Sequence, residues 1–148
     1  MTSQNWSICD YQPDHEAGLV ALWKQAGIYR AWNDPHLDIA RKTQQMAQTG
    51  YGLFLVVRAR PSQIIGSVMA GYDGHRGSVN YLAVHPDWQM RGIGRALMGQ
   101  VENWCEAEGC PKINLLVRTD NEQVKAFYDR LGYRVDEVVG LSKRLIED

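Results

Sequence analysis

The sequence predicts an α/β fold of seven strands and four helices in the order β-α-α-β-β-β-α-β-α-β-β. Two observations predict it. Short runs rich in β-branched and apolar residues, typical of strands, alternate with segments whose apolar residues recur at helical spacing. The length of 148 residues suits a single domain, residues 1–148, with room for a sizeable core.

Each helix is bounded by recognisable start or stop residues. Asn33 or Asp34 can cap the second helix, and Asn121 can cap the last, because their side chains accept hydrogen bonds from free N–H groups. Pro35 suits a first helical position, and Gly27, Gly109 and Gly132 can end helices. We expect the helices over residues 11–27, 33–46, 93–109 and 121–131.

The strands fall into a central group and two flanking groups. The three central strands are joined by short turns, which favours an antiparallel meander. A weak strand precedes the first helix, one short apolar strand lies between the third and fourth helices, and two strands follow the last helix. We expect strands over residues 6–9, 53–59, 64–72, 79–84, 113–117, 133–139 and 141–146.

Charge and hydropathy exclude several classes of protein. The net charge is −1, so no overall positive field attracts nucleic acid. The N-terminus lacks the basic and then apolar pattern of a signal peptide. The apolar run at 51–57 is far short of the roughly 20 residues that span a bilayer. We therefore expect a cytoplasmic protein without a membrane or nucleic-acid partner.

Cysteine and histidine patterns indicate neither a disulfide framework nor a metal site. The three cysteines, Cys9, Cys105 and Cys110, are odd in number and form no CxxC pair. The four histidines are scattered and form no HExxH motif. We expect free thiols and no metal.

A glycine-rich turn, "QMRGIGRAL" at 89–97, joins a predicted strand to a predicted helix. The first N–H groups of a helix lack intrahelical partners and attract phosphate, and glycine lets the backbone approach an anion closely. The dinucleotide fingerprint needs a small residue where Leu97 stands, and a P-loop needs a Gly-Lys-Ser/Thr that is absent. The acyl-CoA pattern Gln/Arg-x-x-Gly-x-Gly/Ala fits residues 89–94, although such a turn also starts helices that bind nothing.

The motifs around this turn carry a family resemblance. The segment "YLAVHPDWQMRGIGRALM" (81–98) resembles the strand–loop–helix core of the GNAT acetyltransferase superfamily, and Asn121 with "AFYDRLGY" (126–133) resembles its second motif. Three further segments, 30–42, 71–77 and 143–148, are similar to small bacterial YpeA-type acetyltransferases. The resemblance implies a central mixed, mostly antiparallel, seven-stranded sheet, splayed between its fourth and fifth strands and flanked by four helices.

The resemblance also implies a cosubstrate, acetyl-CoA, and the residues that bind it. The pyrophosphate would lie on the backbone of residues 89–95, with added charge from two arginines, and the pantetheine arm would pair with strand 79–84. The backbone N–H near Leu82 would polarise the thioester carbonyl. The residues implied in cosubstrate binding are Leu82, Val84, Gln89, Met90, Arg91, Gly92, Gly94, Arg95 and Asn121.

Tyr128 is the candidate general acid. It follows Asn121 by seven positions, nearly two helical turns, so both face the same way. A phenol has a pKa of about 10 and is protonated at neutral pH, so it can donate a proton to a leaving thiolate. The alternative is a core tyrosine with a bonded hydroxyl.

The general base is left open. Neither the strand at 78–84 nor the segment 113–118 contains an acidic residue, although many family members carry a glutamate there. A chain of waters, an acceptor of low pKa, Asp73 and His75 are the alternatives. Asp73 also fits an ordinary hairpin turn at "DG".

The segment "YRAWNDP" (29–35), between the first two helices, lies where the family places the acceptor. Arg30 could bind a carboxylate in a bidentate pair; the alternative is a capping turn with Trp32 anchored in the core. The candidate acceptor residues are Tyr29, Arg30, Trp32, Asp34 and His75.

The function that follows is transfer of an acetyl group from acetyl-CoA to a primary amine, by direct attack within a ternary complex. The acceptor is a small-molecule or peptide amine. The alternatives are a module of the same fold that binds CoA with little catalysis, and a nucleotide-binding domain. Still open are the acceptor's identity, longer acyl groups, and a homodimer through edge strands near the C-terminus.

Overall fold

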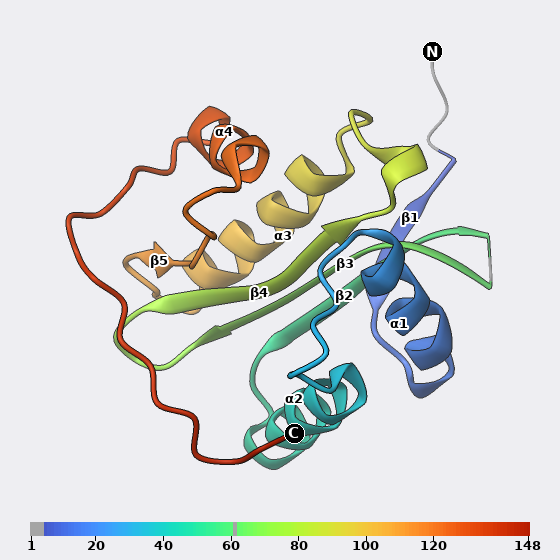
Figure 1. The fold of residues 1–148 in the computed structure, drawn as a ribbon, viewed down its shortest axis with the longest axis horizontal. Coiled ribbons are helices and arrows are strands. Elements are labelled where there is room, and N and C mark those ends of the chain that lie inside the picture. The colour runs from blue at the N-terminus through green and yellow to red at the C-terminus, as the bar shows by residue number, and fades with distance from the viewer. Residues whose placement is uncertain (1–4, 61) are drawn as a thin grey trace.

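The computed structural model describes residues 5–60 and 62–148, which form a five-stranded sheet with four α-helices (Figure 1). The prediction of an α/β fold with four helices is confirmed. The strands are β1 Ser7–Asp10, β2 Leu53–Arg60, β3 Gln63–Tyr72, β4 Gly77–Val84 and β5 Ile113–Asn114. The helices are α1 Glu16–Gln25, α2 Pro35–Thr49, α3 Ile93–Ala107 and α4 Glu122–Arg130.

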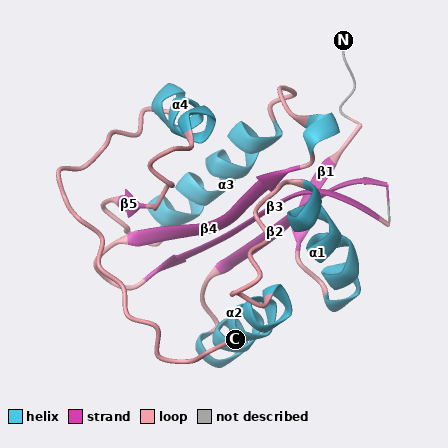
Figure 2. Cartoon of the chain, viewed as in Figure 1, coloured by secondary structure: helices cyan, strands magenta, loops and turns pink. Residues whose placement is uncertain are grey.

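The sheet is mixed and mostly antiparallel, as predicted. Its order, β1-β2-β3-β4-β5, follows the chain, with three antiparallel neighbours and one parallel pair, β4 with β5. Successive strand residues point to opposite faces, so the sheet supports two cores. One core packs against α3 and α4 and the other against α1 and α2, as the arrangement in Figure 2 illustrates.

Strand β4 pairs with β5 at only one end. The parallel ladder joins Gly77 to Ile113 and Ser78 to Asn114, and β5 then ends. The expected strand at 113–117 is therefore shorter than predicted, and Leu116 is 93% exposed. Residues 79–84 of β4 have no β5 partner, so the edge of β4 is open where the strand leads toward α3.

The prediction of seven strands is wrong. No strand follows α4 in the described part of the chain, and both predicted segments, 133–139 and 141–146, are irregular. A further strand needs a neighbour with free backbone groups, and β5 offers an edge of only two residues. The chain instead runs around the outside from α4 to α2 (Figure 1). The alternating apolar residues that suggested strands are exposed: Val135, Val138, Val139, Leu141, Leu145 and Ile146.

A bulge interrupts the pairing of β3 with β4 halfway along. The register shifts between Ser67 and Met69, and Tyr81 takes a left-handed φ of 54°, which is rare for a bulky residue. The Ser67 hydroxyl donates to the Tyr81 carbonyl at 2.7 Å and accepts the Trp23 indole N–H at 2.9 Å. The Tyr81 ring stacks on Trp23, with centroids 3.9 Å apart. These contacts fix the bulge to helix α1.

Replacing the buried hydroxyl tests this anchor. Ser67→Ala should lower the free energy of unfolding by about 2 kcal/mol, because it leaves the Trp23 N–H and the Tyr81 carbonyl without their partner. Urea denaturation measures the change. Ser78→Ala, which removes an exposed hydroxyl from β4, is the control and should stay within about 0.5 kcal/mol of the parent. Equal stability of both variants would contradict the anchor.

Candidate active site

The glycine turn forms the N-terminus of α3, as predicted. Gly92 is the N-cap with a φ of 85°, and the first helical bond runs from the Ala96 N–H to the Gly92 carbonyl. The N–H groups of residues 93–95 therefore lack intrahelical partners. A Cβ built on Gly92 would meet no atom within 4 Å, so the space over the turn is open. The turn has the free donors and the room that an anion needs.

Gly94 also has a packing role that the sequence did not suggest. It lies in the first turn of α3, and a Cβ there would come within 3.1 Å of the Phe127 ring. Its missing side chain lets α4 pack closely against α3, beside the cradle. The two glycines thus serve two needs, because Gly92 provides the left-handed conformation and Gly94 the close helix contact.

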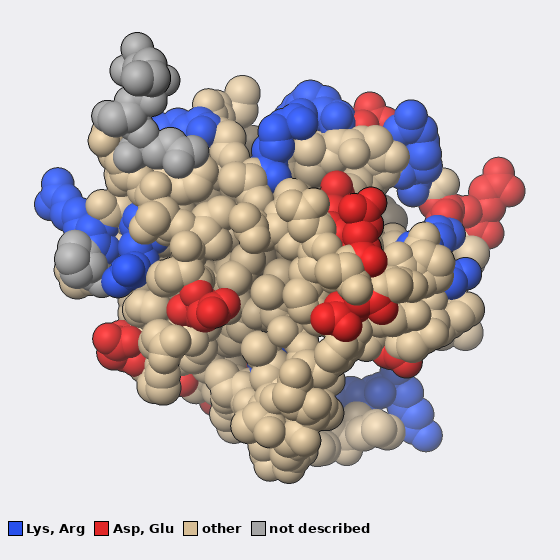
Figure 3. Space-filling model, turned by 180° about the vertical axis from the view of Figure 1, so that it is seen from behind, with Lys and Arg blue, Asp and Glu red and all other residues tan. Residues whose placement is uncertain are grey.

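The side chains of the cradle are exposed and carry positive charge. Arg91 lies over the Trp88 ring at 4.7 Å, a cation–π contact that directs the guanidinium. Gln89 and Arg95 are exposed, and Met90 is 94% exposed with a left-handed φ of 64°. Figure 3 shows several Lys and Arg side chains along the edge that carries α4 and the loop before α3, with Asp and Glu side chains beside them. The arginines nearest the free N–H groups of α3, Arg91 and Arg95, suit an anionic ligand there.

Leu82 and Val84 lie on the open part of β4. Both are half-buried and pack against the core under α3 and α4. Their strand has no β5 partner here, so its edge can pair with an extended ligand, as a further strand would. Leu82 directly follows Tyr81, the residue of the bulge.

Tyr128 lies on α4 with its ring buried. The ring contacts Phe127 and Tyr133 edge-on, with centroids 5.1 and 5.3 Å away. Burial raises the pKa of the Tyr128 phenol well above its usual value, so it is protonated at every physiological pH. Among the described residues none hydrogen-bonds its hydroxyl, which leaves the proton available to a ligand.

Asn121 caps α4. Its side-chain oxygen accepts the Val124 N–H at 3.1 Å, as the sequence predicted. The cap orients the helix that carries Tyr128. A contact from Asn121 to a cosubstrate stays a prediction.

The acceptor candidates between α1 and α2 do not all lie together. Tyr29 and Asp34 line a cavity of about 260 Å³ with Lys24, His36 and Asp148. Asp34 caps α2 by accepting the His36 N–H at 2.9 Å. Arg30 and Trp32 share the loop but do not line this cavity.

The hydrogen bonds of Arg30 and the exposure of Trp32 indicate what each side chain does in this loop. The Arg30 guanidinium donates to the carbonyls of Gly27 and Tyr29, both at 2.9 Å, so it braces its own turn. Trp32 is 59% exposed, so the alternative in which it anchors the core is wrong.

His75 lies apart from the other candidates, in the β3–β4 turn at the end of β4 that pairs with β5. Asp73 accepts the N–H groups of His75 and Arg76, both at 2.8 Å. These backbone bonds, those to Arg76 and His75 foremost, lower the pKa of the Asp73 carboxyl. Asp73 has the hairpin role that the sequence offered as an alternative.

The structure adds one cluster that the sequence analysis missed. Asp38 of α2 accepts the Tyr81 hydroxyl and the Asn33 side-chain amide on the same oxygen, both at 2.5 Å. The Asn33 amide also donates to the Tyr81 hydroxyl at 2.9 Å. Asp38 and Tyr81 are 43 positions apart in the sequence. Taken by itself, Asp38 resembles any acidic residue in the first turn of a helix. No local pattern signals the contact.

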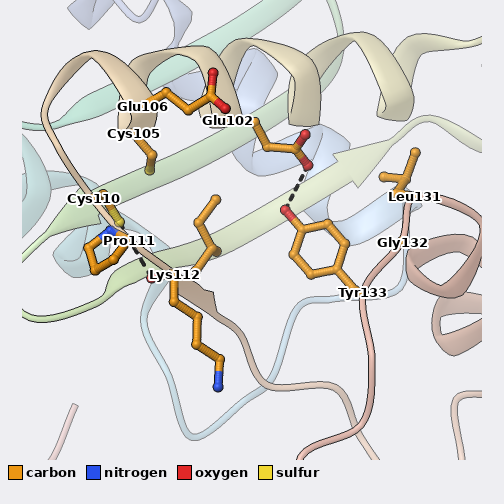
Figure 4. Close-up of a pocket in the computed structure, with 10 residues that line it drawn as sticks. Glu102, Cys105, Glu106, Cys110, Pro111, Lys112, Leu131, Gly132 and Tyr133 are labelled. Carbon is orange, nitrogen blue, oxygen red and sulfur yellow. Dashed lines mark hydrogen bonds between the residues drawn. The ribbon is translucent and has the colours of Figure 1, made fainter.

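A second cavity, of about 340 Å³, lies beside the far end of α3 and includes none of the predicted site residues (Figure 4). Tyr133 donates to Glu102 there at 2.8 Å. Burial, followed by the neighbouring Cys110, raises the pKa of the Cys105 thiol to about 11. The three cysteines are free thiols, and in residues 5–60 and 62–148 no three His, Cys, Asp or Glu side chains group as a metal site requires.

Comparisons with known proteins identify the family. The profile described as the acetyltransferase (GNAT) family matches residues 9–133. An acetyltransferase of Pectobacterium atrosepticum is 48% identical over 137 residues, 93% of each chain. An acetyltransferase of Yersinia pseudotuberculosis is 44% identical over 138 residues, 93% of this chain and 94% of that one.

Among solved structures, the PaiA N-acetyltransferase of Thermoplasma acidophilum in complex with coenzyme A superposes with a TM-score of 0.75 at 17% identity. The match covers 91% of this chain and 93% of that one. The superposition shows that the two chains share a fold. The chain belongs to the GNAT acetyltransferase family, and the prediction that it is an acetyltransferase is confirmed. None of the helices in the described part of the chain is long and apolar enough to cross a bilayer.

The cap on α4 offers a direct test of how the site is positioned. Asn121→Ala should lower the free energy of unfolding by about 1 kcal/mol, because it removes the acceptor for the Val124 N–H. Asn121→Ser keeps a capping oxygen and should retain most of the stability. Asn103→Ala, an exposed change within α3, is the control and should cost nothing. Thermal unfolding compares the four proteins; an unaffected Asn121→Ala variant would contradict the cap.

Proposed function

We propose that the protein transfers the acetyl group of acetyl-CoA to a primary amine of a small molecule or peptide, by direct attack within a ternary complex. The observation that carries the proposal is the open edge of β4 beyond Ser78, which leads into the free N–H groups at the start of α3. A strand edge followed by an anion cradle matches a ligand with an amide-bearing arm and a pyrophosphate. Membership of the GNAT family supports the same ligand.

The residues present fit this cosubstrate. The N–H groups of residues 93–95, with Arg91 and Arg95, would hold the pyrophosphate, and the open backbone around Leu82 and Val84 would pair with the arm. Gln89, Met90, Gly92 and Gly94 shape the turn, and Asn121 caps the neighbouring α4. The cosubstrate supplies a thioester, whose carbonyl carbon is the electrophile.

In the proposed reaction, residues of the chain act on the carbonyl oxygen and on the leaving sulfur. The lone pair of the amine forms the new N–C bond, and the backbone N–H near Leu82 stabilises the negative charge on the carbonyl oxygen. Collapse breaks the C–S bond, and Tyr128 donates its proton to the leaving sulfur. The amine loses one proton in return. The hydroxyl of Tyr128, which no other described residue hydrogen-bonds, supports its role as the acid.

Ligand-dependent stability tests the cradle. Acetyl-CoA or CoA at about 100 times its Kd should stabilise the fold by about 2.7 kcal/mol, a Tm increase of about 5–10 °C, whereas NAD and ATP should not. Thermal unfolding with each of the four ligands measures the effect. Stabilisation by NAD or ATP alone would contradict the proposal.

Turnover distinguishes the transferase from a module that binds CoA without catalysis. Tyr128→Phe should lower kcat at least tenfold while keeping affinity for acetyl-CoA, because only the proton donor is lost. CoA release with a primary amine reports kcat, and thermal stabilisation by acetyl-CoA reports binding. Tyr72→Phe, which removes a hydroxyl in the β3–β4 turn, is the control. Full activity in Tyr128→Phe would remove the assignment of the acid.

A further inference from the structure

We propose that Asp38, Tyr81 and Asn33 form the site for the acceptor's ammonium group, and that Asp38 is the general base that takes its proton. The inference rests on the proposed transferase function and names the base that the strands lack. It also defines the acceptor class, a primary amine that arrives as an ammonium ion.

The three residues come from three different elements and meet on the α1–α2 side of β4. Asp38 comes from α2, Asn33 from the loop before it and Tyr81 from the bulge of β4. The Tyr81 ring packs with the core under α1 and α2, whereas Leu82, the next residue, packs with the core under α3 and α4. Tyr81 thus directly precedes the backbone proposed to hold the thioester carbonyl, and its hydroxyl forms the cluster on the α1–α2 side of the strand.

Asp38 keeps the capacity to accept another donor. The hydroxyl of Tyr81 and the amide of Asn33 both donate to Oδ2. Among the described residues, Oδ1 has only Arg41 as a partner, at 3.5 Å, and Arg41 makes its shorter bonds, 2.8 and 3.2 Å, to Asp148. A carboxylate has about four acceptor positions, so Oδ1 can receive an ammonium N–H. The side chain of Asp38 is 24% exposed, so a ligand can reach it.

The charged and titratable groups that face Asp38 are few. Arg41 lies on the same helix, Asp148 comes from the C-terminus, and Tyr81 comes from β4. Burial, followed by its hydrogen bond to Asp38, raises the pKa of Tyr81 far above its usual value, so the phenol stays a donor. Arg41 is balanced by Asp148, and Tyr81 is neutral. Arg144 also acts on Asp148, so the two arginines match the two carboxylates in charge. The feature that can receive an ammonium N–H is therefore the open acceptor position on Oδ1 of Asp38.

The contacts of the bulge hold the cluster in place. Ser67 fixes the Tyr81 backbone, and Trp23 stacks on its ring. Asp38 is in the first turn of α2, whose N-cap is Asp34. A base must be held in such a fixed geometry to reach the proton that it takes.

The proton steps balance. The ammonium group, R–NH₃⁺, gives one proton to Oδ1 of Asp38 and becomes the neutral amine whose lone pair forms the N–C bond. The second proton, which the nitrogen loses as the amide forms, passes to solvent. The thiolate that leaves takes its proton from Tyr128, on the other side of β4, and both side chains return to their starting state by exchange with solvent.

The test compares Asp38→Asn with the parent protein on acceptors that differ in protonation. Ethanolamine, cadaverine and tyramine are alkylammonium ions at pH 7, since alkylamines have a pKa of about 10; hydroxylamine is mostly neutral there. Calorimetry on the CoA-saturated protein measures binding of each probe, and CoA release from acetyl-CoA measures transfer. Asp38→Asn keeps an oxygen acceptor but takes up no proton.

We expect at least one alkylammonium probe to bind the parent protein and to bind at least tenfold more weakly to Asp38→Asn. Its kcat/KM at pH 7 should fall about 100-fold, and the loss should shrink as the pH approaches 10, because the amine then loses its proton in solution. Transfer to hydroxylamine should change less than threefold. Asp38→Glu, which retains a carboxylate, should recover part of the activity.

Asp14→Asn, which neutralises an exposed carboxylate just before α1, is the matched control and should behave like the parent. No binding of any alkylammonium probe, equal binding by Asp38→Asn, or an equal loss with hydroxylamine would each overturn the inference. If Asp38→Asn does not fold, the parent protein alone provides the test. Alkylammonium probes that bind it no better at pH 7 than at pH 10 would overturn the inference. Thermal stabilisation by acetyl-CoA is measured separately. If acetyl-CoA does not stabilise the parent protein, the proposed function fails, and this outcome is distinct from a failure of the inference about Asp38.

Discussion

The hydroxyl of Ser67 holds together the part of the molecule on which the site depends. It bonds the indole of Trp23 on α1 and the carbonyl of Tyr81 on β4, and so fixes the bulge between β3 and β4. A bulge turns successive residues of one strand in directions that a regular ladder does not permit. Tyr81 consequently faces the helix pair α1 and α2, while the backbone that follows belongs to the open edge of the sheet. One buried hydroxyl thus links the core of α1 to both halves of the site.

The second constraint is the early end of β5. Because β5 pairs with only two residues of β4, the rest of that edge has no protein partner, and the chain enters the turn before α3 directly from it. Gly92 gives the turn its left-handed step, and Gly94 brings Phe127, and with it α4, against the start of α3. The open strand edge therefore leads directly to the helix terminus, and Tyr128 of α4 packs in the same core as Leu82 and Val84. We propose that an extended ligand with a phosphate group at one end lies on this surface.

Much of this surface could be predicted because its signals are local. The cap of Asn121, the N-cap of Asp34 and the left-handed Gly92 each depend on a few neighbouring residues, and the structure has all three. The second role of Gly94 could not be predicted, because Phe127 lies on another helix. The prediction of two C-terminal strands was wrong for a related reason. Alternation at 133–146 indicates which side chains share a face, but a strand also needs a neighbour to pair with, and β5 provides too little edge.

The general base could not be predicted from local sequence either. The strands contain no acidic residue at the expected positions, but Asp38 of α2 accepts a hydrogen bond from Tyr81 of β4. This places the two proposed proton transfers on opposite faces of one strand, with Asp38 on the side of α1 and α2 and Tyr128 on the side of α3 and α4. An amine that enters from one face and a thiolate that leaves toward the other need not exchange protons directly. Since β4 separates the two groups, each can have the environment that its own task requires: a charged carboxylate reached by solvent on one side and a buried neutral phenol on the other.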